Sequence, residues 1–247
     1  MRKQLILTAL ATTLPLVGLA HAEEESSPFS ANVSIVSDYD SRGVSQTNES
    51  PAIQGGFDFA HSSGVYAGVW ASSISWLRDA ERHTNVSSGN SAEVDFTVGY
   101  AREFGDFGVD VGATYYLYPG SYSHNWKDVT GMKNPNSTEG FVGLSWKFVS
   151  VKYYHAFTHL FGAPSSRGSG YLDLSVSYEI LKDLSLDAHF GSQRVTGPGE
   201  SYRDWKAGAV YNLGGYDLGL HYVNTDISHA DKVDADARVV FSLSKSF

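Results

Sequence analysis

Cysteine is absent from the 247-residue chain, so neither a disulfide framework nor a thiolate metal site is available. Only seven prolines occur, against 25 glycines and 15 tyrosines, a balance that favours β structure with tight turns. Beyond the N-terminal segment, no run approaches the roughly 20 apolar residues of a transmembrane helix. If the chain enters a membrane, it must therefore do so as a closed β-barrel.

The N-terminal segment has the features of a secretory signal peptide. A basic start precedes the uncharged, mostly apolar run 5–20, and a small-x-small sequence ending at Ala22 supplies a cleavage site. We predict that residues 1–22 are a cleaved signal and that 23–247 form one exported domain. A membrane-spanning helix is the weaker alternative, because the run is short and contains Pro15.

Apolar and polar residues alternate with a period of two along almost the whole mature chain, which predicts strands. The pattern is clearest in 92–103, where alanine, valine, phenylalanine and tyrosine alternate with acidic and small residues. We predict an all-β chain of twelve strands, near residues 31–39, 52–60, 65–75, 92–103, 109–118, 142–148, 151–158, 172–180, 184–190, 205–211, 218–222 and 238–247.

The predicted connections fall into two classes. Every odd-to-even connection is long and polar and every even-to-odd connection is short, which is the asymmetry of an outer-membrane barrel with short periplasmic turns and longer extracellular loops. A soluble barrel or sandwich, with its apolar face turned inward, is the alternative. Aromatic residues near the predicted strand ends favour the membrane barrel, as an interfacial girdle: Trp76, Tyr100, Tyr118, Tyr178, Tyr211 and Tyr222.

The last strand ends the sequence on an aromatic residue. Phe241, Leu243 and Phe247 share one face, and this pattern resembles the C-terminal signal by which outer-membrane barrels reach their insertion machinery. Lys245 departs from that pattern, and we interpret it as a side chain that extends to the membrane interface.

Four segments carry a family resemblance: SRGVSQ (41–46), PAIQGG (51–56), YAGVWAS (66–72) and YYLYPG (115–120). Together with the surrounding strands, they resemble the TorF-type porin family of Gram-negative bacteria over nearly the whole mature chain. The resemblance implies an outer-membrane barrel and little chemistry.

No arrangement of residues in the sequence predicts catalysis or a cofactor. A G-x-S-x-G elbow is absent, and although Ser75 and His155 share the parity of apolar residues, nothing brings them together. His155 and His159 are spaced for a metal on a helix, but on a strand they are too far apart to share one ion. The acidic segment 226–236 could gather a divalent cation, although a solvated loop is favoured. We therefore predict no catalytic residue, cofactor or metal site.

The face opposite the apolar residues predicts a charged lumen in which acids exceed bases, and hence an interior that attracts cations. Arg42 is a candidate constriction residue, with an exposed position at the rim as an equal alternative. The predicted lumen charges are Asp38, Asp58, Glu93, Asp95, Asp110, Asp173, Glu179, Asp187, Asp204, Lys147, Lys152, Lys206 and Arg238.

These features predict an outer-membrane, porin-like channel for passive diffusion of small polar or cationic solutes. The alternatives are a closed structural or surface-binding barrel and, less favoured, a barrel-embedded lipid hydrolase. The expected partners are outer-membrane lipid and lipopolysaccharide, periplasmic chaperones, the barrel-insertion machinery and small polar solutes. Nucleic acid is not an expected partner, because acidic residues outnumber basic ones 27 to 18.

Overall fold

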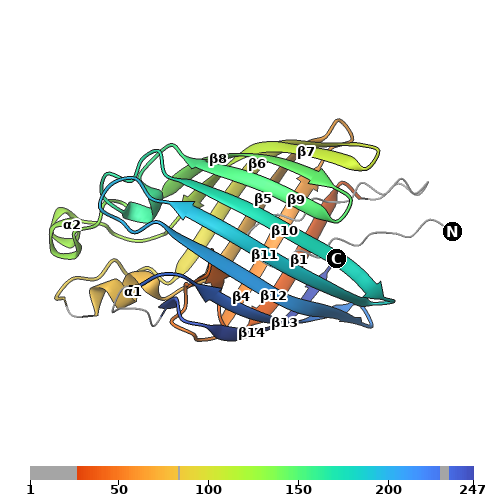
Figure 1. Ribbon diagram of the computed structural model, residues 1–247. Helices are drawn as coiled ribbons and strands as arrows, with labels where there is room; N and C mark the ends of the chain where they lie inside the picture. The colour runs from red at the N-terminus through yellow and green to blue at the C-terminus, as the bar shows by residue number, and fades with distance from the viewer. Residues whose placement is uncertain (1–26, 83, 229–233) are drawn as a thin grey trace.

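The computed structural model describes residues 27–82, 84–228 and 234–247, so the predicted signal peptide lies outside the described residues. Twelve antiparallel strands form one closed barrel, in which the first strand pairs with both its successor and the last strand (Figure 1). The strands are β1 (Phe29–Val36), β4 (Ala52–Ala60), β5 (Val65–Ser73), β6 (Ala92–Phe104), β7 (Phe107–Leu117), β8 (Ser137–Trp146), β9 (Val149–Ala156), β10 (Gly170–Leu181), β11 (Leu184–Arg194), β12 (Tyr202–Leu213), β13 (Tyr216–Thr225) and β14 (Arg238–Ser246). The prediction of a twelve-stranded antiparallel barrel is confirmed.

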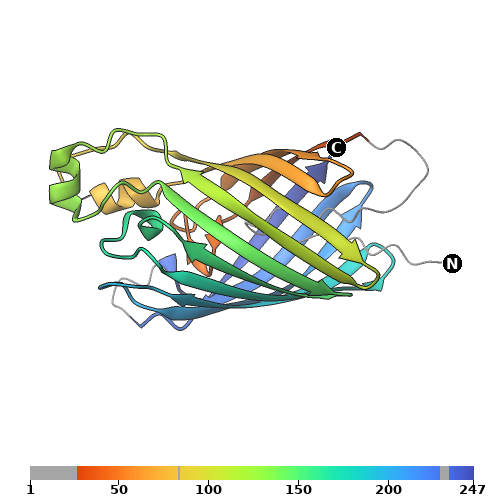
Figure 2. The same cartoon turned by 90° about the horizontal axis from the view of Figure 1, so that it is seen from above.

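The remaining elements all lie in the long connections. They are the short strands β2 (Asp40–Ser41) and β3 (Val44–Ser45), the helices α1 (Trp76–Glu81) and α2 (His124–Thr130), and the 3-10 turn η1 (Leu160–Gly162). Both helices extend beyond one end of the barrel, here called the loop end, and the C-terminus lies at the opposite turn end (Figures 1 and 2). No helix among the described residues is long and apolar enough to cross a membrane.

The outer surface of the barrel is apolar and the inner surface is polar. On β6, Phe96 and Val98 are 47% and 60% exposed, whereas Asp95 and Thr97, which alternate with them, are buried. A soluble barrel would bury its apolar face, so this arrangement is that of a barrel whose outer surface meets lipid.

Inward-facing glycines make room for large side chains that fill the lumen. The strand pairing sets Tyr66 opposite Gly99, and a Cβ atom at Gly99 would lie 2.5 Å from the tyrosine ring. Phe141 lies over Gly112 in the same manner. On β5, Tyr66 therefore points into the lumen, where its hydroxyl donates to Asp110.

A buried cluster at the loop end, formed by the ends of β1, β4 and β7 and by the connections that carry α1 and α2, corrects part of the predicted aromatic girdle. Tyr118 is buried, and its ring packs edge-on against that of Trp76 on α1. The prediction that these two side chains face the membrane interface is wrong, because the long connections fold back and cover them. Tyr178, Tyr211 and Tyr222 do face outward and are exposed.

The carboxylate of Glu81 joins α1 and α2, which together we call the cap. Glu81 of α1 accepts hydrogen bonds from the Ser88 amide (2.8 Å) and from Nε1 of Trp126 on α2 (2.6 Å). Burial raises the pKa of Glu81, but these hydrogen bonds outweigh it and hold that pKa below its ordinary value. The ionised form of Glu81 therefore stabilises the cap.

Candidate functional site

The connection between β1 and β4 folds into the barrel as a small hairpin. Arg42 and Gly43 form its two-residue turn with φ angles of 51° and 81°, the positive values that a tight type I′ turn requires. The turn touches the barrel wall, since a Cβ atom at Gly43 would lie 2.5 Å from side-chain atoms of Asp204 and Thr225. Glycine is required at position 43 for both reasons. We call residues 37–51 the inserted hairpin.

The guanidinium group of Arg42 forms polar contacts across the lumen. It forms a salt bridge with both carboxylate oxygens of Glu139 on β8, of which the Nη1–Oε1 contact measures 3.2 Å. Nη1 also donates to Oε1 of Gln193 on β11 at 2.9 Å. The Arg42 side chain is 10% exposed and that of Glu139 is fully buried. Of the two expectations for Arg42, the structure places the side chain inside the barrel, away from the rim.

Three aromatic rings surround the same guanidinium group. Its central carbon lies 4.5 Å from the centroid of Tyr171, 5.3 Å from Tyr154 and 5.7 Å from Phe161. Cation–π attraction of this kind strengthens when the cation is removed from water. We call Glu139, Gln193, Tyr154, Tyr171 and Phe161 the arginine cage.

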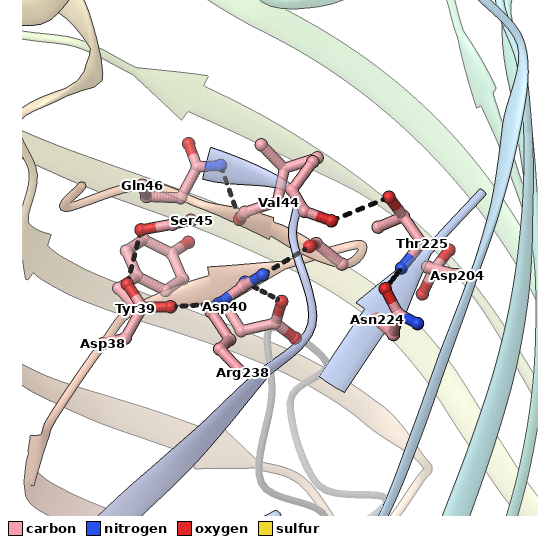
Figure 3. A network of polar contacts seen from close by, with 12 residues as sticks. Asp38, Tyr39, Asp40, Val44, Ser45, Gln46, Asp204, Asn224, Thr225 and Arg238 are labelled. Carbon is pink, nitrogen blue, oxygen red and sulfur yellow. Dashed lines mark hydrogen bonds and ion pairs between the residues drawn. The ribbon is translucent and has the colours of Figure 1, made fainter. Parts of the chain in front are cut away.

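A second arginine fastens the base of the inserted hairpin (Figure 3). Arg238 on β14 donates to Asp38, to Asp40 (2.7 Å) and to the carbonyl of Gly43 (2.9 Å). Thr47 completes the network by donating to Asp38 at 2.9 Å. The two arginines therefore fix the hairpin at both its base and its tip.

Most of the other lumen acids also have partners. Lys152 pairs with Asp110 at 2.7 Å, and Nε2 of His189 lies 2.8 Å from Asp204. The remaining two pairs are His189 with Asp173 at 3.4 Å and His221 with Asp187 at 2.9 Å.

Three lumen carboxyl groups differ from these. Glu93 and Asp95 on β6 and Asp58 on β4 each have one buried oxygen without a hydrogen-bond partner among the described residues. Glu93 and Asp95 are buried, whereas Asp58 is partly exposed.

Twelve of the thirteen predicted lumen residues fall into three groups. Asp58, Glu93, Asp95, Asp110, Asp173, Asp187, Asp204, Lys152, Lys206 and Arg238 lie on inward positions of the strands. Asp38 lies on the inserted hairpin, because β1 ends at Val36. Glu179 is exposed near the turn end of β10.

The lumen prediction for Lys147 is wrong. This residue lies in the tight turn between β8 and β9, with a φ angle of 55°. Its ammonium group lies 3.9 Å from Asp106 of the neighbouring turn and over the outward-facing ring of Trp146. The predicted strand extended to Phe148, whereas β8 ends at Trp146, and the turn moves Lys147 off the wall.

The sequence did not lead to Glu139, the acidic residue of the arginine cage. Glu139 lies outside the predicted strands, since the predicted sixth strand began near residue 142 and β8 begins at Ser137. Its even spacing from Phe141 and Gly143 is the signal that could have identified it as inward-facing. His189 and His221 have the same kind of signal, because each shares the parity of inward residues on its strand.

The inserted hairpin divides the lumen into two parts. Around the hairpin, on the loop side, Asp38, Glu139, Gln193 and Asp204 are all buried. Toward the turn end, inward residues such as Asn32, Ser34, Ser175 and Ser177 are partly exposed. Solvent therefore reaches part of the turn side of the lumen, although Asp110 and Val210 on that side are also buried, and the hairpin occupies the loop side.

The structure does not bring together the residues considered for hydrolysis. Ser75 donates to Asp79 of α1 at 2.7 Å, whereas the His155 ring lies between those of Tyr153 and Phe157 on the outer side of β9. The described residues contain no group of three or more His, Asp or Glu side chains that could hold a metal ion. Residues 229–233 of the acidic segment lie outside the described part of the chain.

Comparisons with solved structures identify the class of fold. The barrel is similar to the KdgM porin in complex with disordered oligogalacturonate, with a TM-score of 0.53 and 11% identity over 89% of this chain and 98% of that chain. Two weaker likenesses are the NanC porin (TM-score 0.49, 13% identity, 89% of this chain and 98% of that chain) and outer membrane phospholipase A from Escherichia coli (TM-score 0.45, 12% identity, 89% of each chain). The fold is thus that of a porin-like barrel.

The family follows from a match over nearly the whole chain. Residues 21–247 match the family described as "Bacterial protein of unknown function (Gcw_chp)", and the chain belongs to it. No curated protein sequence matches the chain.

Proposed function

We propose that this protein is an outer-membrane, porin-like channel for passive diffusion of small polar or cationic solutes. The observation that carries the proposal is a closed barrel with an apolar outer surface and a polar lumen that solvent enters from the turn end. The porin-like fold and the sequence resemblance to TorF-type porins support the same function. In this proposal residues 1–22 direct export, the barrel-insertion machinery assembles the chain, and no covalent step occurs.

The selectivity of the channel follows from its lumen charges. Acidic side chains outnumber arginine and lysine on the inward positions of the described strands, and Asp58, Glu93 and Asp95 each have one oxygen without a hydrogen-bond partner in that part of the chain. A low-dielectric wall strengthens the attraction of these carboxylates for cations. Arg42 and the inserted hairpin form the constriction and limit the solute size.

A second candidate function is a closed barrel that acts through its loop end. The observations that favour it are the ion pairs of Asp110, Glu139, Asp204 and the hairpin aspartates, together with the buried loop-side lumen. In this alternative the inserted hairpin is a permanent plug, and the cap of α1 and α2 is the functional surface.

Single-channel conductance in a planar bilayer distinguishes the two functions. The protein is first shown to be folded by its resistance to SDS without heating. Discrete current steps with a cation-selective reversal potential in a salt gradient support the channel, and silence from folded protein supports the closed barrel. The Glu93→Gln/Asp95→Asn variant should lose part of the cation preference, whereas Asp106→Asn, at an exposed turn, should retain it.

A further inference from the structure

The guanidinium group of Arg42 is bound by side chains from outside the inserted hairpin. Every contact of the guanidinium group described above comes from β8, β9, β10, β11 or η1, and none comes from the inserted hairpin itself. A planar cation is stacked on aromatic rings and paired edge-on with a carboxylate, the two interactions that suit a guanidinium best.

The arginine cage is held in shape by contacts that do not involve Arg42. Tyr171 donates its hydroxyl to Asp204 at 3.0 Å, and Gln193 donates from Nε2 to the carbonyl of Gly170 at 3.1 Å. The second bond leaves Oε1 of Gln193 directed at the guanidinium. These partners belong to the wall, so Tyr171 and Gln193 keep their positions whether or not the hairpin is inserted.

Withdrawal of Arg42 would leave the Glu139 carboxylate of the cage without its paired cation. Glu139 is fully buried, and a buried carboxylate without a partner is costly. An ammonium ion satisfies the charge but lacks the planar face and the paired N–H groups, and a neutral urea has the shape but lacks the charge.

We propose that the arginine cage is a binding site for guanidinium-bearing solutes, which Arg42 occupies as an internal ligand. A solute of this class competes with Arg42, and its binding favours withdrawal of the inserted hairpin. The binding site depends on the cage alone and does not require the barrel to conduct.

Calorimetry and thermal unfolding of the full-length chain in detergent test this site, with methylguanidinium as the probe and methylurea as its neutral isostere. Folded Arg42→Ala should bind methylguanidinium with measurable heat. At ten times the Kd, the midpoint of unfolding should rise by about 3–6 °C. Methylurea should leave the midpoint unchanged. Wild-type protein should respond weakly at the same concentration, because the tethered Arg42 has a high effective concentration in the cage.

Two further variants keep the test decisive. Arg42→Gln replaces Arg42→Ala if the alanine variant does not fold. Arg42→Ala/Glu139→Gln should lose the response, because the cage then lacks its carboxylate. The proposal is overturned if folded Arg42→Ala and Arg42→Gln both fail to bind methylguanidinium, if methylurea acts equally, or if the double variant still responds.

Discussion

Replacing Arg238 with glutamine should release the inserted hairpin at its base. The guanidinium of Arg238 contacts Asp38, Asp40 and the carbonyl of Gly43. The side chains of Arg238 and Asp38 are only 6% and 5% exposed. Glutamine retains part of the volume but removes the cation that both carboxylates contact.

The size of the effect follows from the burial of this network. Removing one partner of a buried ion pair costs about 3–5 kcal/mol, because the remaining charge stays desolvated. Withdrawal of the hairpin returns Asp38 and Asp40 to water and relieves that cost. With each 1.4 kcal/mol worth a factor of ten, the ratio of withdrawn to inserted hairpin should rise roughly 100-fold to several-thousand-fold.

The absence of native cysteine makes this ratio measurable. Val44 lies beside the hairpin turn, and its side chain has no role in the Arg238 network, so Val44→Cys introduces a single reporter thiol. When closing of the hairpin is faster than labelling, the labelling rate follows the population of the withdrawn state. Purified protein in detergent is labelled with a bulky maleimide, in the Arg238 and Arg238→Gln backgrounds.

Two controls separate hairpin release from other effects. Ser91→Cys, at an exposed position, should be labelled rapidly in both backgrounds. Lys147→Gln removes a partly exposed cation at the turn end and should leave Val44→Cys labelling unchanged. Equal labelling of Val44→Cys with and without Arg238, in protein that remains folded, would refute the role given to this network.

Three further predictions concern packing, pH and assembly. Gly99→Ala should destabilise the barrel by about 1–3 kcal/mol in denaturant unfolding, because the new Cβ meets the Tyr66 ring, and Tyr66→Ala in the same chain should recover part of the loss. The lowered pKa of Glu81 means that its contribution to cap stability is present above the ordinary carboxyl pKa and is lost as the pH falls through the lowered value. The fluorescence of Trp126 should therefore shift to the red on acidification, and a Glu81→Gln variant that retains the same transition would contradict this assignment. Deletion of Phe247 should reduce the fraction of heat-modifiable barrel in the membrane, and undiminished assembly would remove the role predicted for the C-terminal aromatic.

The sequence by itself determined the barrel, because the local alternation of apolar and polar residues decides where strands form and which side chains point inward. The predicted strand 52–60 has the same bounds as β4. The two classes of connection length correctly predicted that long connections lie at one end of the barrel and short turns at the other. The inward parity of Asp95 and Asp110 could also be read directly, since successive side chains of a strand point to opposite faces. Errors arose where strands met turns, as at Lys147, because turn geometry depends on single backbone angles.

Only the tertiary structure decided how the lumen is occupied. Arg42 meets a carboxylate 97 positions away, and Arg238 meets one 200 positions away. Such pairs depend on the closure of the ring and on a loop turning inward, and no local pattern specifies either. The same charged residues could line an open pore or hold a plug in place. The sequence gives their number, but only the fold decides which of them form pairs.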